Sequence, residues 1–480
     1  MPQLGSQLKR LGRHSIVYGL GGLVSRILAV LLLPLYTRYL STSDYGKVEI
    51  LIAATAVLAI LLQFGISNAF FRFYFDTPDP ARRITVLRTS FWFTMTTATA
   101  GLVVGLALAP QISHVLFASG SEANLVRASF VGLWAQLNYL QLTALFRVEE
   151  RSVAFVLASI ANILITVGAT LVLVVSLHKG PMGVIVGNFI GTLAVYLALL
   201  GYRREQLGLE FDRGLFRAMN RFGMPLVPSA LLLWVTNFAD RFILVKLAST
   251  SEVGLYSVGV RISSAMILLL TAFRTAWPAF AYSIEDDGEA KSAYGFVLTY
   301  LVLISSWVAA ALGLLSPWLV HWLAASEYAR ASQVVGPLAF STVAFAGYIV
   351  LAIGVGRARR TQFNWIVSGL AAVVNIGLCF ALIPAHGMMG AAIATVAAYV
   401  VMFLAMAWWS QRTYPVPYQW RRVTTAAGVA VALVAAGKLT HAGLVLSAAL
   451  ALCYPLGLGL AGFYLPAERK RLRALVARVY

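Results

Sequence analysis

Long apolar segments recur along the whole chain, and this pattern restricts the fold more than any other feature. Each holds about twenty residues, the length that an α-helix needs to cross a bilayer. With 60% hydrophobic and only 11% charged residues, a water-soluble protein could not cover so much apolar surface. We therefore predict an all-α integral membrane protein with about fourteen spans, at 15–36, 48–70, 86–109, 125–146, 153–176, 182–201, 224–247, 253–276, 294–314, 332–353, 363–384, 388–409, 423–440 and 444–464.

The basic residues indicate how these spans are oriented. The chain carries 37 Lys and Arg against 18 Asp and Glu, a net charge of +19. If the N-terminus is cytoplasmic, most of the arginine clusters fall in cytoplasmic loops, as the positive-inside rule requires. We expect both termini in the cytoplasm and interpret the excess charge as a topology signal, with a second role in holding anionic lipid headgroups. No motif supports binding to nucleic acid.

An internal repeat divides the spans into two groups. The hexamer Ser41-Thr42-Ser43-Asp44-Tyr45-Gly46 returns as Ser249-Thr250-Ser251-Glu252-Val253-Gly254, and Gly180-Pro181-Met182-Gly183 returns as Gly387-Met388-Met389-Gly390, at nearly the same offset. Two matches at one offset indicate a duplicated unit. Six spans separate each copy from its partner, so the copies lie on the same side of the membrane. This predicts two parallel repeats, a pattern of transporters that work by alternating access.

The repeat and the charge pattern together predict four regions. Residues 1–201 form an N-lobe of six spans, and residues 223–410 form a C-lobe of six more. Between them, 202–222 is expected to be a cytoplasmic amphipathic linker, because its apolar residues alternate with arginines in a pattern typical of a helix at the membrane interface. Residues 411–480 hold two extra spans and a basic cytoplasmic tail.

Several motifs resemble those of the polysaccharide transport family, within the multidrug/oligosaccharidyl-lipid/polysaccharide exporter superfamily. The first is the stretch Leu33-Pro34-Leu35-Tyr36-Thr37-Arg38-Tyr39-Leu40 with the hexamer that follows it. The second is Asp240-Arg241-Phe242-Ile243-Leu244 followed by Glu252-Val253-Gly254-Leu255-Tyr256. The third is Asn375-Ile376 leading to Ile383-Pro384 and the glycine motif at 387–394. The resemblance extends over about residues 8–410.

This resemblance implies a flippase of the bacterial inner membrane. Its cargo would be a polyprenyl-pyrophosphate-linked oligosaccharide, which is made in the cytoplasm and delivered outside for cell-surface polysaccharide synthesis, such as O-antigen or exopolysaccharide. The partners implied are this cargo, membrane lipids and the polysaccharide polymerase machinery. The resemblance also implies a central cavity between the two lobes, lined by the first two spans of each repeat.

Three arginines inside predicted cavity spans are candidate substrate-binding residues: Arg26, Arg241 and Arg261. A charge inside the membrane costs about 2.5–3.5 kcal/mol, so each needs a partner or a wet cavity. Guanidinium groups bind pyrophosphate through paired charge-assisted hydrogen bonds. At helical spacing, Asn237 lies one turn before Arg241, and Ser257 one turn before Arg261. These two polar residues complete the predicted binding set. The alternative interpretation is that the arginines join helices.

Two acids, Glu49 and Asp240, also lie inside predicted spans. Either could carry a coupling proton or neutralise an arginine, and we favour ion pairing. Adjacent helical residues point about 100° apart, so Asp240 and Arg241 are expected to find different partners. We expect a cavity of net positive charge. The histidines and remaining acids show no metal-binding spacing, and we expect neither a metal nor a cofactor.

Two other functions are alternatives to the flippase. A cation-coupled antiporter for drugs or small metabolites would share the fold, but such antiporters depend on buried acids. A membrane glycosyltransferase, glycan polymerase or ligase would need a large outer loop with catalytic residues. The longest predicted outer loops, at 110–124 and 316–331, are about fifteen residues each, so we predict that the protein is not an enzyme.

Overall fold

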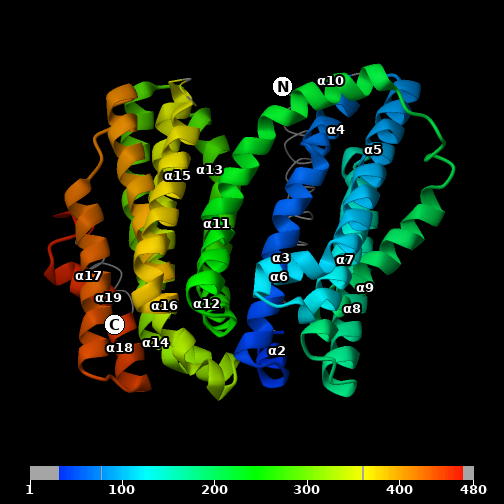
Figure 1. Ribbon diagram of the computed structural model, residues 1–480. Coiled ribbons are helices and arrows are strands. Elements are labelled where there is room, and N and C mark those ends of the chain that lie inside the picture. The colour runs from blue at the N-terminus through cyan, green and yellow to red at the C-terminus, as the bar shows by residue number, and fades with distance from the viewer. Residues whose placement is uncertain (1–31, 77, 359, 361, 467, 469–480) are drawn as a thin grey trace. The chain divides into compact units, whose positions relative to one another are not determined.

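The protein is described here from a computed structural model, which describes residues 32–76, 78–358, 360, 362–466 and 468 (Figure 1). The described part is helical throughout and contains no strand. Its first helices are α2 (Leu33–Tyr39), α3 (Thr42–Gln63), α4 (Ile66–Phe75), α5 (Pro80–Ala107), α6 (Ala109–Phe117), η1 (Gly120–Glu122), α7 (Ala123–Val148), α8 (Ser152–Leu171), η2 (Val172–Ser176), α9 (Gly180–Arg203), α10 (Arg213–Gly223), η3 (Met224–Leu226) and α11 (Val227–Leu247).

The remaining helices complete the chain to residue 460. They are α12 (Thr250–Ser263), α13 (Ala265–Ser283), α14 (Asp287–Leu323), η4 (Ser326–Ala331), α15 (Ser332–Arg357), α16 (Gln362–Thr413), α17 (Trp420–Leu439), α18 (Leu444–Leu452) and α19 (Tyr454–Leu460). Contacts divide the chain into two compact units, 1–254 and 255–480. The predicted lobes follow the repeat instead, and they stay a prediction.

The first unit is built around α5, α7, α8 and α9, which pack on one another. Its core contains Phe91, Leu142 and Tyr196 at the centre, joined by Leu215 and Met219 from α10. The buried face of α7 also carries Asn138, Gln141 and Thr143. Gln141 donates a hydrogen bond to the Ser90 hydroxyl at 2.8 Å, which satisfies a polar group that would otherwise be costly to bury.

A sharp bend separates α3 from α4 in the first unit. Phe64 and Gly65 both have left-handed backbone conformations, with φ of 46° and 73°. The bend brings Gly65 against Gly223, at the end of α10, so closely that a Cβ at Gly65 would lie 2.2 Å from the Gly223 carbonyl oxygen. Only glycine fits at Gly65, because it tolerates the positive φ and has no side chain.

The second unit is built around α14, α15, α16 and α17, in which α15 packs on both α14 and α16, and α17 packs on α14. Tyr294, Val350 and Met406 are among its fully buried core residues. The helix α16 contains one non-helical residue, Gly387, with φ of 52°. This break lies between the two predicted spans 363–384 and 388–409. Both spans therefore lie within α16, on either side of Gly387.

Nine helices in the described part are long and apolar enough to cross a membrane. The predicted count of fourteen is not confirmed, and the reasons are physical. The polar buried face of α7 lowers its mean hydropathy. The predicted span 253–276 is interrupted at Ser264, between α12 and α13. The last predicted span is interrupted at Cys453, between α18 and α19. Most of the first predicted span lies outside the described residues.

Candidate functional site

The helices α3 and α11 of the first unit run antiparallel and touch at several levels (Figure 1). Near the middle, the Trp234 indole donates a hydrogen bond to the carbonyl oxygen of Ala53 at 2.9 Å. At one end, the bend after α3 holds Gly65 against Gly223. Towards the other end, charged side chains from both helices meet inside the protein. The pair of helices therefore forms a continuous interface that positions the charges.

The charged cluster consists of Glu49, Asp240 and Arg241, all buried to at least 94%. The Arg241 Nη1 lies 3.2 Å from Asp240 Oδ1 and donates to the backbone carbonyl of Asn237 at 2.7 Å. Its Nε lies 3.9 Å from Glu49 Oε2. The guanidinium also lies 5.1 Å from the centre of the Phe238 ring, in range of a cation–π interaction. One arginine is thus held between two acids.

The expectation that Asp240 and Arg241 find different partners is wrong. Their Cβ atoms do diverge, but the arginine side chain is long enough to fold back along α11. Asp240 accepts hydrogen bonds from the backbone N–H of Arg241 at 2.8 Å and from its guanidinium. A helical-wheel argument locates Cβ atoms and not the ends of long flexible side chains.

The charge of this cluster does not contribute to the cavity of net positive charge that the sequence predicts. With all three groups ionised, Glu49, Asp240 and Arg241 sum to −1. Breaking a buried ion pair by removing one partner typically costs about 3–5 kcal/mol, because the other charge stays buried. The arginine therefore stabilises both acids, and the first unit supplies no net positive charge from these residues.

The two repeated hexamers touch each other, which the sequence did not predict. Thr42 and Ser251 lie with their hydroxyl oxygens 2.7 Å apart, and so do Ser43 and Thr250. The second residue of each copy is thus bonded to the third residue of the other. This is the reciprocal pattern of a contact with twofold symmetry.

Each hexamer also starts a helix and brings its glycine to the contact. The Ser41 hydroxyl accepts from the N–H of Asp44 at 3.1 Å, and Ser249 does the same for Glu252, so both are N-caps. A Cβ at Gly46 would lie 1.8 Å from the Thr250 carbonyl oxygen, and a Cβ at Gly254 would lie 2.0 Å from that of Thr42. The glycine in each copy is the feature of the sequence that could have indicated this close approach, because it has no side chain.

The other predicted site residues lie apart from these features. Asn237 is exposed, and its side chain donates to the Leu233 carbonyl oxygen. Ser257 is fully buried in α12, within the second unit, and its hydroxyl has no hydrogen-bond partner among the described residues. Arg261 is half-buried one turn further on. Arg26 lies outside the described residues.

A family model described as "Polysaccharide biosynthesis protein" matches residues 35–333, more than half of the chain. The chain belongs to this polysaccharide biosynthesis family. A sequence comparison with curated proteins finds no match. The region that matches the family includes both hexamers and the Glu49–Asp240–Arg241 cluster, so the contacts of these two features lie inside the matched segment.

Three solved structures are similar in fold. One is described as the lipid II flippase MurJ in an inward closed conformation, with a TM-score of 0.72, 12% identity, and coverage of 92% of this chain and 98% of that one. An inward-facing multidrug-resistance MATE transporter of the MOP superfamily has a TM-score of 0.67, 15% identity, and coverage of 82% and 93%. An outward-facing MATE transporter has a TM-score of 0.58 and 15% identity, with coverage of 84% of this chain and 95% of that one. These likenesses establish the fold of this polysaccharide biosynthesis family member as that of a multi-pass membrane protein.

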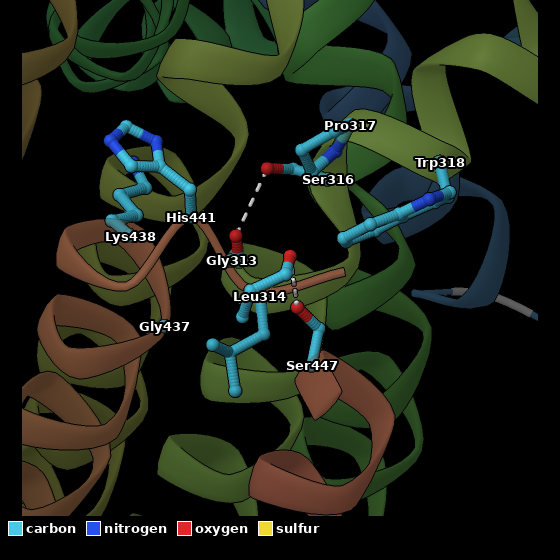
Figure 2. Close-up of a pocket in the computed structure, with 10 residues that line it drawn as sticks. Gly313, Leu314, Ser316, Pro317, Trp318, Gly437, Lys438, His441 and Ser447 are labelled. Carbon is cyan, nitrogen blue, oxygen red and sulfur yellow. Dashed lines mark hydrogen bonds between the residues drawn. The ribbon is translucent and has the colours of Figure 1, made fainter. Parts of the chain in front are cut away.

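The second unit contains a cavity of about 350 Å³ between one end of α14 and the turn from α17 to α18 (Figure 2). Ser316 and Ser447 line it, and both hydroxyls already donate to backbone carbonyls, those of Gly313 and Ala442. Lys438 and His441 stand exposed at its side. None of the predicted site residues lines this cavity, and only its α14 side lies inside the segment that matches the family model.

Proposed function

We propose that this protein is a flippase that carries a polyprenyl-pyrophosphate-linked oligosaccharide from the cytoplasmic to the outer leaflet of the bacterial inner membrane. The observation that carries the proposal is the reciprocal contact between the two repeated hexamers. It joins the ends of corresponding helices that the charge pattern places outside. A transporter that opens alternately to each side needs a closure of this kind, built from equivalent elements of its two repeats.

The strength of this contact suits a closure that opens. A neutral hydrogen bond contributes about 0.5–1.5 kcal/mol net, so the two hydroxyl pairs contribute about 1–3 kcal/mol. No ion pair joins the two hexamers among the described residues. A closure of this strength can be separated by a cargo whose binding energy differs by a few kcal/mol between the two states.

We assign the pyrophosphate to Arg26 and Arg261, with Ser257 and Asn237 as neutral polar contacts for the cargo. Arg241 has a different role in this proposal, because its guanidinium is already held between Asp240 and Glu49. We infer that it balances the two acids and fixes α11 against α3, and that it contacts cargo only if the cluster rearranges.

Membership of the polysaccharide biosynthesis family supports the glycan part of the cargo, and likeness to a structure described as a lipid II flippase supports the lipid part. We infer that the protein performs no covalent chemistry and that both termini are cytoplasmic. The flipped cargo would pass to polysaccharide polymerase machinery on the outer face.

A second candidate is a cation-coupled antiporter of the same superfamily. It is favoured by one observation, the two buried carboxylates Glu49 and Asp240 beside Arg241. In that case the carboxylates would bind the coupling cation. The fold is shared with MATE transporters, so the distinction rests on what is transported.

The test compares a deletion strain with strains that express wild-type protein or the Arg261→Ala variant. We expect the deletion to accumulate a complete lipid-linked oligosaccharide unit in the cytoplasmic leaflet, detected by mass spectrometry of extracted lipids. Arg261→Ala should leave the protein in the membrane and reproduce this accumulation, and Arg261→Lys should correct it only in part. A deletion strain with normal lipid-linked intermediates and increased sensitivity to cationic drugs would favour the antiporter.

A further inference from the structure

The exposed face of α10 carries a row of three arginines, Arg213, Arg217 and Arg221. They are spaced four residues apart, so they lie above one another on one side of the helix. In the described part of the chain, none of the three has an ion-pair or hydrogen-bond partner for its side chain. We call this row the α10 arginine stripe.

Arginines that lie close to α10 but outside the stripe are paired. Arg82 binds Asp212 at 3.1 Å, Arg88 binds Glu210 at 2.7 Å, and Arg203 binds Glu149 at 2.7 Å. The carboxylates of Asp212, Glu210 and Glu149 are therefore paired with other arginines and do not neutralise the positive charge of the stripe.

The opposite face of α10 fixes the orientation of the stripe. Leu215 and Met219 are buried in the core of the first unit, where α10 packs on α4 and α5. The Asp212 side chain accepts from the N–H of Leu215 at 2.9 Å and caps the start of the helix. In Figure 1, α10 runs across the ends of α4 and α5. The stripe therefore stays exposed, because rotating the helix would expose its buried residues.

An uncompensated stripe is unfavourable for the isolated protein. Like charges four residues apart on a helix repel by about 0.2–0.5 kcal/mol per pair. Arg213 also lies in the first turn of α10, where the helix dipole disfavours a cation. An external partner that supplies negative charge along the stripe would remove both costs.

Exposed apolar residues beside the stripe indicate where that partner lies. Leu209 is 92% exposed, and Phe211, Phe222 and Met224 are 40–44% exposed. Apolar side chains of this size are unfavourable in water but favourable at the boundary between lipid headgroups and acyl chains. Arginines and apolar residues along one interfacial segment are the pattern of a helix that lies on an anionic membrane surface.

We propose that the α10 arginine stripe binds the phosphate groups of anionic lipids in the cytoplasmic leaflet. Each arginine near a negatively charged leaflet contributes enough attraction to change lipid binding roughly fivefold. The pyrophosphate of the cargo has similar chemistry. The stripe, however, offers a single open row of charges next to apolar residues, which matches the leaflet better than an enclosed anion site.

The test measures lipid binding by the full-length purified protein in detergent, by native mass spectrometry, with added phosphatidylglycerol or phosphatidylcholine. Wild type should retain phosphatidylglycerol preferentially. The triple variant Arg213→Gln/Arg217→Gln/Arg221→Gln should bind it roughly 100-fold more weakly, with phosphatidylcholine binding unchanged. A charge-matched control, Arg204→Gln/Arg412→Gln/Arg421→Gln, removes three exposed arginines from other segments and should bind like wild type.

A second variant and a competition experiment provide two further tests of the proposal. If the triple variant aggregates, the single charge reversal Arg217→Glu should still lower phosphatidylglycerol binding, because Arg217 is exposed and its substitution buries nothing. Equal losses in the stripe and control variants would overturn the proposal. So would displacement of phosphatidylglycerol from the stripe by an equimolar polyprenyl pyrophosphate, which would assign the stripe to the cargo. Because no transport is measured, the result is independent of the proposed flippase function.

Discussion

Gly46 and Gly254 hold the same position in the two repeated hexamers, and each packs against the backbone of the other copy. A Cβ at Gly46 would lie 1.8 Å from one carbonyl oxygen, and a Cβ at Gly254 would lie 2.0 Å from another. The duplicated sequence thus makes contact with itself, at the place where we propose that the outer closure forms.

The first prediction tests whether this close approach is required. Gly46→Ala and Gly254→Ala should each separate the two helix ends, because backbone atoms cannot move aside as flexible side chains do. We expect lower transport and a lower melting temperature in detergent for both variants. The control is Gly168→Ala in α8, where a Cβ would meet nothing within 4 Å. It should be neutral or slightly stabilising, by up to about 1 kcal/mol. Normal melting and transport in both test variants would show that the contact has no role.

The second prediction concerns a disulfide that cross-links the two hexamers and holds the proposed closure shut. In a background with Cys379→Ala and Cys453→Ala, the pair Thr42→Cys and Ser251→Cys should form a disulfide on oxidation, because the native hydroxyl oxygens lie 2.7 Å apart. Transport should stop when the disulfide forms and return after reduction. Thr42→Cys alone is the control and should transport under both conditions. Full transport by the cross-linked protein would mean that this contact does not open.

The third prediction separates charge balance from proton coupling in the buried cluster. Asp240→Asn should keep transport, because the amide oxygen can still accept from the Arg241 backbone and guanidinium, and the cluster becomes neutral. Arg241→Ala should instead destabilise the protein by about 3–5 kcal/mol, since two carboxylates stay buried without their arginine. Glu49→Gln is the matched control for Asp240→Asn. Thermal unfolding gives the first comparison, and transport in vesicles with and without a proton gradient gives the second. A dead Asp240→Asn variant of a gradient-dependent transporter would identify Asp240 as the proton carrier.

The fourth prediction concerns acid and the segment before α10. The hydrogen bond from Arg88 lowers the pKa of Glu210, and the N–H of Leu215 lowers the pKa of Asp212. Their contribution to stability is therefore complete above the ordinary carboxylate pKa and is lost as the pH falls through the lowered values, below about pH 4. A spin label on Leu209→Cys, in the background without native cysteines, should become more mobile over that range. The Glu210→Ala/Asp212→Ala variant, which has no side-chain acceptor at either position, should be mobile at every pH. A pH-independent label in the unsubstituted segment would contradict the prediction.

The class of the protein could be predicted from the amino-acid order alone. Apolar segments of bilayer length predict membrane helices, because backbone groups in lipid must be bonded within the helix. The hexamers and the Asp240–Arg241 motif indicated a repeat and a family, and the family is confirmed. The charged residues buried inside the bundle were also found, since ionisable residues stand out in apolar segments.

Which of these residues meet depends on how distant segments pack and could not be predicted from local sequence. The folding of Arg241 back onto Asp240 depends on side-chain conformation, which helical periodicity does not determine. The pairing of Thr42 with Ser251 depends on two helix ends about two hundred residues apart, and no local pattern encodes such a contact. The orientation of the α10 arginine stripe depends on which residues of the first unit bury Leu215 and Met219. Local sequence determines where helices form and what they carry, whereas packing between distant helices determines which side chains lie within bonding distance.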